Sequence, residues 1–221
     1  MTPYYADELV TIYNARCEDV LPSIDPADVD LLLTDPPYGI NLDPDYTRRT
    51  FGGGTRAPSG YQRIEGDDAE FDPRPLFRYE PCILFGANNF APLLPVGGWI
   101  VWDKREQTPS NQLADVELAW CSKRGPARIF RHYWNGPVRS TERGFHVHPT
   151  QKPVALMRWI VDRWTDPGGL VLDPYMGSGP VAQACHELGR RYIGIELAEE
   201  YCKVAVSRLS QQTLDLEGGA A

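Results

Sequence analysis

Short apolar runs that end at an acidic turn alternate with longer segments of helical period along this chain. Residues 29–34 and 170–172 are such runs, and they are followed by Asp35 and Asp173, respectively. Runs of this length are typical of strands buried on both faces, and their alternation with helices predicts a doubly wound, mostly parallel α/β sheet. Because ligands bind beyond the carboxyl ends of the strands in such sheets, both aspartates mark candidate sites.

The remaining pattern extends this sheet into one domain. Further strands are expected at 82–85, 99–102, 127–134 and 192–195, and helices at 154–164, 180–188 and 198 to about 209. A length of 221 residues fits one domain with a real core, so we expect a single domain over residues 1–221. Residues 40–66 have no periodicity and include three consecutive glycines, which predicts an embedded flexible loop.

Composition excludes several classes of protein. With 42% hydrophobic and 24% charged residues the chain is an ordinary globular one. No stretch approaches the roughly 20 apolar residues of a membrane span, and the first residues lack the basic-then-apolar pattern of a secretion signal. The five cysteines are scattered, with no Cys-x-x-Cys pair, which argues against a disulfide framework or a zinc ribbon. We therefore expect a cytoplasmic protein that binds no membrane and no metal.

Two basic segments interrupt an otherwise acidic chain of formal net charge −8. The first basic segment, residues 46–64, has no acid, and the second, residues 121–150, has a single glutamate. Such segments can follow a phosphate backbone even on an acidic body, although solvated surface charge explains each of them equally well when taken alone. The basic residues are Arg48, Arg49, Arg56 and Arg63 in the first segment, and Lys123, Arg124, Arg128, Arg131, Arg139 and Arg143 in the second.

A glycine-containing turn follows the strand that ends at Asp173. Residues 173–179 read DPYMGSG, and such a turn lets a ligand approach the backbone at the amino end of the next helix. Glu196 closes the following strand about 20 residues after Gly177, the spacing of an acid that accepts hydrogen bonds from ribose hydroxyls. A carboxylate at Asp173 suits an amino or cationic group and would repel a pyrophosphate. The pattern therefore favours an adenosine-bearing amino-acid cofactor over a dinucleotide.

The other candidate site is the rigid turn Asp35-Pro36-Pro37-Tyr38. The Asp35 carboxylate and the Pro36 carbonyl are both acceptors, and two acceptors aimed at one –NH2 group hold both of its hydrogens and free the nitrogen lone pair. Tyr38 offers an aromatic face, on which stacking of a base contributes about 1–3 kcal/mol. The pattern indicates a site for an exocyclic amine on a flat heterocycle.

Four motifs of this chain, in this order, resemble those of the amino-methylating DNA methyltransferases of the beta class. They are Asp35-Pro36-Pro37-Tyr38, His148-Pro149-Thr150-Gln151-Lys152-Pro153, residues 173–179 and Gly194-Ile195-Glu196-Leu197. The similarity spans about residues 12–209, and the compact size and residues 99–104 resemble the phage-type orphan enzymes. The resemblance implies a single catalytic domain with a Rossmann-like, S-adenosylmethionine-dependent methyltransferase fold of permuted motif order, and double-stranded DNA as the partner.

The resemblance also implies a role for individual residues. It makes Asp35, Pro36, Pro37 and Tyr38 catalytic, and it gives cofactor contacts to Cys17, Thr150, Lys152, Asp173, Gly177, Ser178, Gly179 and Glu196. Thr150 and Lys152 would lie near the cofactor carboxylate. Arg16 stands where the family has an acid near the cofactor adenine, so that only a backbone contact from Cys17 is expected there. Pro180 replaces a threonine of the family, and the turn is expected to survive because proline fits the first helical position.

The activity expected from these motifs is site-specific transfer of a methyl group from S-adenosylmethionine to adenine N6, directly and in line, on a base flipped out of the duplex. Residues 121–147 combine basic and aromatic side chains and form a candidate target-recognition segment, and the 40–66 loop is a candidate to order on DNA. A strand pair with a basic edge is the alternative for 121–147. A homodimer, a restriction partner and the recognition sequence are left open.

Other activities remain open on the same residues. Cytosine N4 methylation uses the same geometry on a smaller base, and an inactive DNA-binding or cofactor-sensing relative is the alternative that the Arg16 departure keeps open. Methylation of a protein glutamine amide is opposed by the motif order and by aspartate rather than asparagine at Asp35. Cys82 is expected to be a buried core thiol and not the nucleophile of a cytosine C5 enzyme, because it opens an apolar run.

Overall fold

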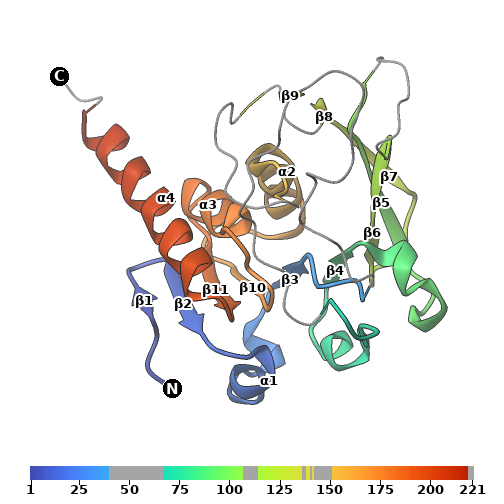
Figure 1. Ribbon diagram of the computed structural model, residues 1–221, viewed down its shortest axis with the longest axis horizontal. Helices are drawn as coiled ribbons and strands as arrows, with labels where there is room; N and C mark the ends of the chain where they lie inside the picture. The colour runs from blue at the N-terminus through green and yellow to red at the C-terminus, as the bar shows by residue number, and fades with distance from the viewer. Residues whose placement is uncertain (40–66, 107–113, 136–137, 140, 142–150, 219–221) are drawn as a thin grey trace.

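The computed structural model describes residues 1–39, 67–106, 114–135, 138–139, 141 and 151–218 (Figure 1). The loop expected at 40–66, with the first basic segment inside it, lies outside the described residues, as do Thr150 and Arg143.

A nine-stranded sheet forms the centre of the described structure, in the strand order β1-β2-β11-β10-β3-β4-β6-β5-β7. Its strands β2, β11, β10, β3 and β4 are parallel, β6 runs antiparallel to both β4 and β5, and β7 is parallel to β5. The strands are β1 (Tyr5–Ala6), β2 (Val10–Asn14), β3 (Leu31–Thr34), β4 (Cys82–Phe85), β5 (Gly98–Asp103), β6 (Val116–Cys121), β7 (Arg128–Arg131), β10 (Leu170–Asp173) and β11 (Arg191–Glu196). A separate antiparallel pair is formed by β8 (Trp134–Asn135) and β9 (Val138–Arg139).

The long helices cover one face of the sheet (Figure 1). They are α2 (Val154–Trp164), α3 (Pro180–Glu187) and α4 (Glu199–Gly218). Leu31 and Leu33 of β3 point into the cluster with these helices, and Leu32 points into a second cluster on the opposite face. That face is covered by short 3₁₀ helices, while α1 (Cys17–Val20) packs on β11 at its edge. The strand β3 is therefore buried on both sides, as its sequence predicts.

The predicted α/β fold with a mostly parallel sheet is confirmed, and three details differ. The strand β6 was not predicted, because its residues, VELAWC, have no clear hydrophobic pattern that sets them apart from the segments on either side. The strand expected at 127–134 is divided into β7 and β8. The helix expected to end near residue 209 continues as α4 to Gly218, and no glycine or proline interrupts residues 210–217.

The strand order places Asp35 and Asp173 side by side. From β10 the chain crosses through α3 to β11 on one side, whereas from β3 it continues to β4 on the other side. The neighbours β10 and β3 therefore form a topological switch point, where open α/β sheets bind their ligands. The order along the chain is permuted, because the strand that carries Asp35 precedes the strand that carries Asp173.

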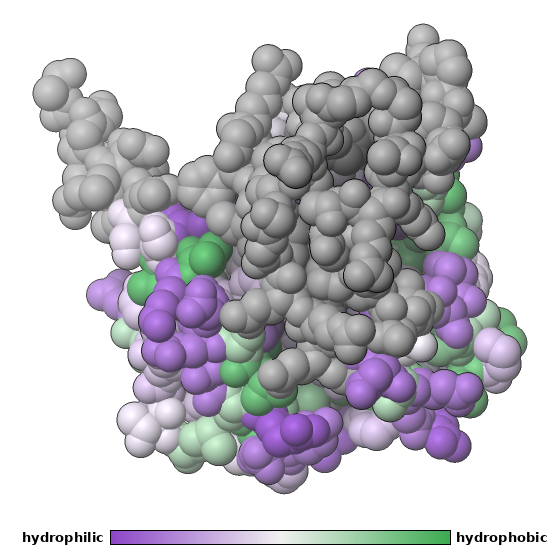
Figure 2. All heavy atoms as spheres, viewed as in Figure 1, coloured by the Kyte–Doolittle hydropathy of each residue, from purple (hydrophilic) through white to green (hydrophobic). Residues whose placement is uncertain are grey.

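The expectations about the cysteines and about membrane segments can be compared with the structure. All five cysteines are buried and free, and burial raises the pKa of the Cys82 thiol, so the prediction of a core thiol is confirmed. No helix in the described part of the chain is long and apolar enough to cross a membrane. Figure 2 shows hydrophilic and hydrophobic side chains interspersed on the described surface of one face.

Candidate active site

A cavity of about 760 Å³ opens where β3 and β10 end. Both predicted motifs line it: Asp35 to Tyr38 after β3, and Asp173 to Ser178 after β10. Glu196 and Cys17 also line the cavity, from the end of β11 and the start of α1. Lys152, Phe85 and residues of the segment 67–76 line it as well, so segments far apart in the sequence meet in one hollow.

Asp173 is almost fully buried and is held by neutral hydrogen-bond donors. Its Oδ1 accepts a hydrogen bond of 2.6 Å from the Thr34 hydroxyl, and its Oδ2 accepts one of 3.2 Å from the Tyr192 hydroxyl. Burial raises the pKa of Asp173 to about 7, and the hydrogen bonds from Thr34, Tyr175 and Tyr192 oppose this rise. The side chain is therefore close to a change of charge at neutral pH, and a cationic ligand would favour its ionised form.

The glycine turn after Asp173 leads into α3 in the way that the sequence predicts. Gly179 is the N-cap residue, with a φ of 76° that favours glycine, and Pro180 occupies the first helical turn. A Cβ atom on Gly179 would lie 2.7 Å from the Ala205 Cβ, so α4 packs directly on this glycine. The replacement of threonine by Pro180 is therefore compatible with the turn.

Glu196 stabilises the same turn. Its Oε2 accepts a hydrogen bond of 2.9 Å from the Gly177 N–H, and its Oε1 accepts one of 2.8 Å from the Ala198 N–H. An ionised carboxylate can accept about four hydrogen bonds. A partly exposed acid held by backbone groups at the rim of the cavity fits a diol such as that of a ribose.

The start of α1 completes this side of the cavity. Cys17 is buried, and its Sγ lies 3.3 Å from the Tyr175 hydroxyl. Arg16 also lines the cavity, but its side chain is 66% exposed and its Nε lies 3.6 Å from a Glu18 carboxylate oxygen. The position at which the resemblance implies an acid near the adenine therefore holds an exposed cation with an acidic neighbour.

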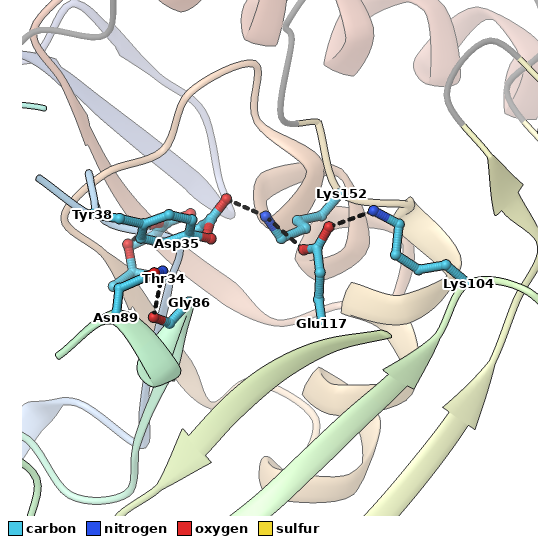
Figure 3. A network of polar contacts seen from close by, with 9 residues as sticks. Thr34, Asp35, Tyr38, Gly86, Asn89, Lys104, Glu117 and Lys152 are labelled. Atoms are coloured by element: carbon cyan, nitrogen blue, oxygen red, sulfur yellow. Dashed lines mark hydrogen bonds and ion pairs between the residues drawn. The ribbon is translucent and has the colours of Figure 1, made fainter. Parts of the chain in front are cut away.

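On the opposite side of the cavity, Tyr38 is held in a fixed position (Figure 3). Its hydroxyl donates a hydrogen bond to Asp35 Oδ1, and its ring lies on Gly86, at the end of β4. A Cβ atom on Gly86 would lie 1.9 Å from Tyr38 Cε1, and the φ of Gly86 is 65°. Glycine is therefore required at this position for two independent reasons, backbone conformation and space for the ring.

Asp35 belongs to a chain of alternating charges that extends from the end of β3 past β4 to β6 and β5 (Figure 3). Its Oδ2 forms an ion pair with Lys152 Nζ, which also lies 3.2 Å from Glu117 Oε2. Glu117 Oε1 in turn accepts a hydrogen bond of 2.7 Å from Lys104 Nζ. Burial alone would lower the pKa of the Lys152 ammonium, but Asp35 and Glu117 outweigh it and raise the pKa well above its ordinary value. Lys152 is therefore a cation that two carboxylates share.

The position of Lys152 is informative for the role that the family resemblance implies for it. The resemblance places it near the cofactor carboxylate, whereas in this structure its ammonium lies on Asp35 and Glu117. Lys152 still lines the cavity, so its expected contact with a cofactor stays a prediction. Thr150, its expected companion, lies outside the described residues.

Three further residues of the site were not predicted from the sequence. Glu117 lies on β6 and Lys104 directly after β5, and the only sequence signal for them is a charged residue in or beside an apolar strand. Asp67 is buried, and its Oδ1 accepts hydrogen bonds of 3.0 Å and 2.9 Å from the N–H groups of Tyr38 and Gly39. It fixes the backbone of the turn at residues 35–39 from 28 residues away, a contact that no local pattern indicates.

The basic residues of the second segment do not all lie near the same ends of the strands. Arg131 pairs with Asp103 at the carboxyl end of β5, the edge at which Asp35 lies. Lys123 and Arg124 follow Cys121, which pairs with the first residue of β5 at the opposite edge. Arg128 lies between these positions, opposite Ile100. Arg139 lies on β9, and Arg48, Arg49, Arg56, Arg63 and Arg143 lie outside the described residues.

Comparison with known proteins agrees with this geometry. A family model described as DNA methylase, of the N6/N4 type, matches residues 29–207. The protein YubD of Escherichia coli (strain K12) is 43% identical over 74 residues, which cover 34% of this chain and 33% of that protein. The type II methyltransferase M2.DpnII of Streptococcus pneumoniae is 31% identical over 114 residues, or 51% and 42% of the two chains. The matches therefore span less than half of the length of either relative.

Solved structures resemble the chain over most of its length. The crystal structure of the M1.HpyAVI–SAM complex has a TM-score of 0.57 and 25% identity, and the match covers 90% of this chain and 100% of that chain. The PvuII DNA methyltransferase, cytosine-N4-specific, has a TM-score of 0.65 over 93% and 88% of the two chains, and at 15% identity it supports the fold alone. Since the family model matches well over half of the sequence, this chain belongs to the N6/N4 DNA methylase family.

Proposed function

We propose that this protein is an S-adenosylmethionine-dependent DNA methyltransferase that methylates the exocyclic amino group of a flipped adenine at N6. The observation that carries the proposal is the shared cavity: Asp35 and Asp173 end neighbouring strands at the switch point and line one hollow of about 760 Å³. One carboxyl group is placed to hold an amine and the other to hold a cationic donor. Their adjacency is the requirement for direct transfer between two ligands.

The catalytic turn would bind and orient the amine. Asp35 and the Pro36 carbonyl would accept its two hydrogens, so that the nitrogen lone pair is free to attack. Tyr38, whose ring is fixed on Gly86, would provide the aromatic surface for the base. Because the attacking nitrogen becomes positively charged, the negative charge of Asp35 stabilises the transition state more than the ground state.

The cofactor side supports S-adenosylmethionine by the chemistry of its donor set. When bound, this cofactor supplies a methyl group activated by a sulfonium centre. Asp173, with its raised pKa, would ionise beside a cationic amino-acid portion, and the turn at Gly177 to Gly179 gives a ligand access to the backbone. The Glu196 carboxylate, which is partly exposed and lines the cavity, suits ribose hydroxyls, and the M1.HpyAVI complex, of similar fold, was solved with SAM.

Adenine is proposed as the target because the turn begins with Asp35 rather than serine, which is a habit of the family's adenine enzymes. The order of motifs, with the catalytic turn before the glycine turn, favours the beta class. Membership of the phage-type orphan subgroup stays a prediction, as do residues 121–147 as target-recognition segment. The PvuII enzyme of similar fold is cytosine-N4-specific, so the base itself has to be measured.

The test is methyl transfer from labelled S-adenosylmethionine to unmethylated double-stranded DNA, followed by digestion to nucleosides and mass analysis. N6-methyladenine that is absent with the Asp35→Ala variant is the expected result. N4-methylcytosine would move the assignment to the cytosine enzymes. A folded protein that binds the cofactor but yields neither product on DNA of diverse sequence would overturn the proposal.

DNA contact at the carboxyl edge of the sheet can be tested with the basic residues that the register separates. Arg131 lies at that edge and Lys123 at the other, and both are exposed. Arg131→Ala is expected to weaken DNA binding. It should also reduce the slope of log K against log salt concentration by about one, because each phosphate contact contributes roughly that much to the slope. Lys123→Ala is the matched control with unchanged binding. Equal losses in both variants would contradict the assignment of this edge.

A further inference from the structure

The chain of charges behind Asp35 is more elaborate than an acceptor for an amine requires. It consists of Asp35, Lys152, Glu117 and Lys104, which we call the charge relay, and it alternates in sign and sums to zero (Figure 3). Lys152 is only 5% exposed, and Glu117 and Lys104 are 27% and 17% exposed. Burying four charges is costly unless each is paired, so this arrangement requires an explanation beyond packing.

The geometry of the relay is that of a shared cation. Lys152 Nζ contacts both Asp35 and Glu117, so any force that draws it toward one carboxylate weakens its contact with the other. Lys104 Nζ occupies the second oxygen of Glu117 at 2.7 Å and so limits how strongly Glu117 attracts Lys152. Glu117 is held on β6 and Lys104 directly after β5, two hydrogen-bonded strands, so their spacing is fixed by the sheet.

We propose that Glu117 and Lys104 are positioning residues that act through Lys152: they set how strongly this cation pairs with Asp35, and thereby the charge and orientation of the catalytic carboxylate. The consequence for catalysis rests on the proposed function, since Asp35 must be ionised to accept the hydrogens of the target amine. Neither residue is placed to touch the amine itself in this arrangement, because Lys152 lies between Glu117 and Asp35.

The charged and titratable groups that face Asp35 within the described residues all bear on the sign of this effect. Tyr38 donates a hydrogen bond to Asp35 from the same turn, Lys152 precedes α2, and Glu117 approaches from β6. Asp173 on β10 is near enough to interact electrostatically. Burial raises the pKa of Asp35, Lys152 opposes this rise, and Glu117 adds to it.

The two positioning residues should therefore shift Asp35 in opposite directions. Removing the charge of Glu117 removes one of the two carboxylates that attract Lys152, and it also removes a negative charge near Asp35, so the pKa of Asp35 is lowered. Removing the charge of Lys104 leaves Glu117 free to attract Lys152, which raises the pKa of Asp35. A purely structural role would disturb the site in the same way in both variants and would not produce opposite signs.

The experiment compares Glu117→Gln and Lys104→Met with the double variant and with two controls. The controls are Glu199→Gln and Lys203→Met, which make the same changes of charge in an exposed ion pair of 3.3 Å on α4. The first measurement is the titration of Asp35 in the ligand-free protein, by carbon NMR of aspartate labelled at the γ-carbon. The signal of Asp35 is assigned by its loss in an Asp35→Asn variant.

We expect the midpoint for Asp35 to move to lower pH in Glu117→Gln and to higher pH in Lys104→Met. The double variant should lie between them, and both controls should match the native protein. The acid limb of the kcat–pH profile should move in the same directions, with kcat at its optimum reduced roughly 10-fold in each single variant because the carboxylate is less well oriented. If one of the single variants does not fold, the direction in which the Asp35 midpoint moves in the other variant still tests the inference.

Midpoints that move in the same direction, or not at all, would overturn the inference. The proposed function is tested separately. If the Asp35 midpoints move as expected but the native protein methylates no DNA, the role of the relay is retained and the assigned reaction is rejected. If methyl transfer is observed while the midpoints stay in place, the relay is rejected and the reaction stands.

Discussion

Asp35 and Asp173 lie at the ends of neighbouring strands and line the same cavity, but the protein holds them in opposite ways. Asp173 is surrounded by neutral donors, the hydroxyls of Thr34 and Tyr192 and the N–H of Tyr175. Asp35 has a cation, Lys152, as its main partner. A buried carboxyl group with neutral partners becomes ionised when a cationic ligand binds beside it. A carboxyl group that is already paired with a cation can be ionised when the ligand is neutral.

This difference divides the cavity into two regions with separate tasks. The region around Asp173 and Glu196 is suited to a cationic cofactor, because two acids line the cavity there and Asp173 is held by the neutral hydroxyls of Thr34 and Tyr192. The region around Asp35 and Tyr38 is suited to an amine without charge. Substitutions in the two regions should therefore change different kinetic constants.

The largest effect is expected from replacing each aspartate by its isosteric amide. Asp35→Asn should lower kcat by about 10²–10³-fold, because the carboxylate charge acts in the transition state, and leave cofactor affinity within a few-fold. Asp173→Asn should instead weaken S-adenosylmethionine binding about tenfold or more. Single-turnover methyl transfer and calorimetric titration of the cofactor separate the two constants. Equal changes in kcat for both variants, with affinity intact, would remove the distinction between the regions.

The raised pKa of Asp173 predicts that the ligand-free protein becomes less stable as pH rises. The folded state keeps this proton up to about pH 7, whereas the unfolded chain releases it near the ordinary aspartate pKa of 3.8. The folded state thus binds more protons in this window, and stability falls as pH rises through it. At about 1.4 kcal/mol per pH unit, the contribution is on the order of 4 kcal/mol.

Asp173→Asn should remove this part of the pH dependence. The measurement is denaturant unfolding of the native protein and the variant between pH 4 and pH 8. Asp28→Asn, at an exposed position, is the control and should keep the native slope. A variant whose stability falls with pH as steeply as that of the native protein would show that Asp173 is not the group responsible.

Two glycines with positive φ allow the same comparison through the backbone. Gly86→Ala would push the Tyr38 ring away and should lower kcat about tenfold or more, whereas Gly179→Ala would press on Ala205 and should raise the cofactor KM. Both variants also lose about 1–2 kcal/mol of stability from the left-handed conformation. Gly168→Ala is the control, because its φ is 78° but a Cβ would meet nothing within 4 Å. It should lose stability alone, and a matching fall in its kcat would mean that strain, not position, explains the others.

The sequence was sufficient for the parts of the site that are local in the chain. Asp35 to Tyr38 and Asp173 to Gly179 each lie in one turn after one strand, so hydrophobic pattern and turn chemistry place them at the same edge of the sheet. The position of Pro180 in the first turn of α3 followed from proline's fixed φ in the same way.

The parts that were missed depend on contacts between distant segments. Glu117 meets Lys152 only because β6 is inserted antiparallel between β4 and β5, and β6 itself carries no clear pattern. Asp67 reaches the Tyr38 backbone across a long insertion. The role implied for Lys152 came from its motif, and its ion pairs with Asp35 and Glu117 could be seen only once the strand order was known.

The smallest effect is expected at Thr34, where the two regions meet. Its hydroxyl donates to Asp173 and accepts a hydrogen bond of 3.2 Å from the Tyr175 N–H, although its backbone leads directly into Asp35. Thr34→Val keeps the shape and should cost about 0.5–1.5 kcal/mol of stability, while the pKa of Asp173 rises further because a hydrogen bond that lowers it is lost. Cofactor affinity at pH 7 should fall a few-fold and kcat should stay nearly constant, whereas Thr34→Ser should retain both. If kcat falls more than cofactor affinity, the Thr34 hydroxyl contributes mainly to the region around Asp35. Thr34 would then have to be assigned to that region and not to the region around Asp173.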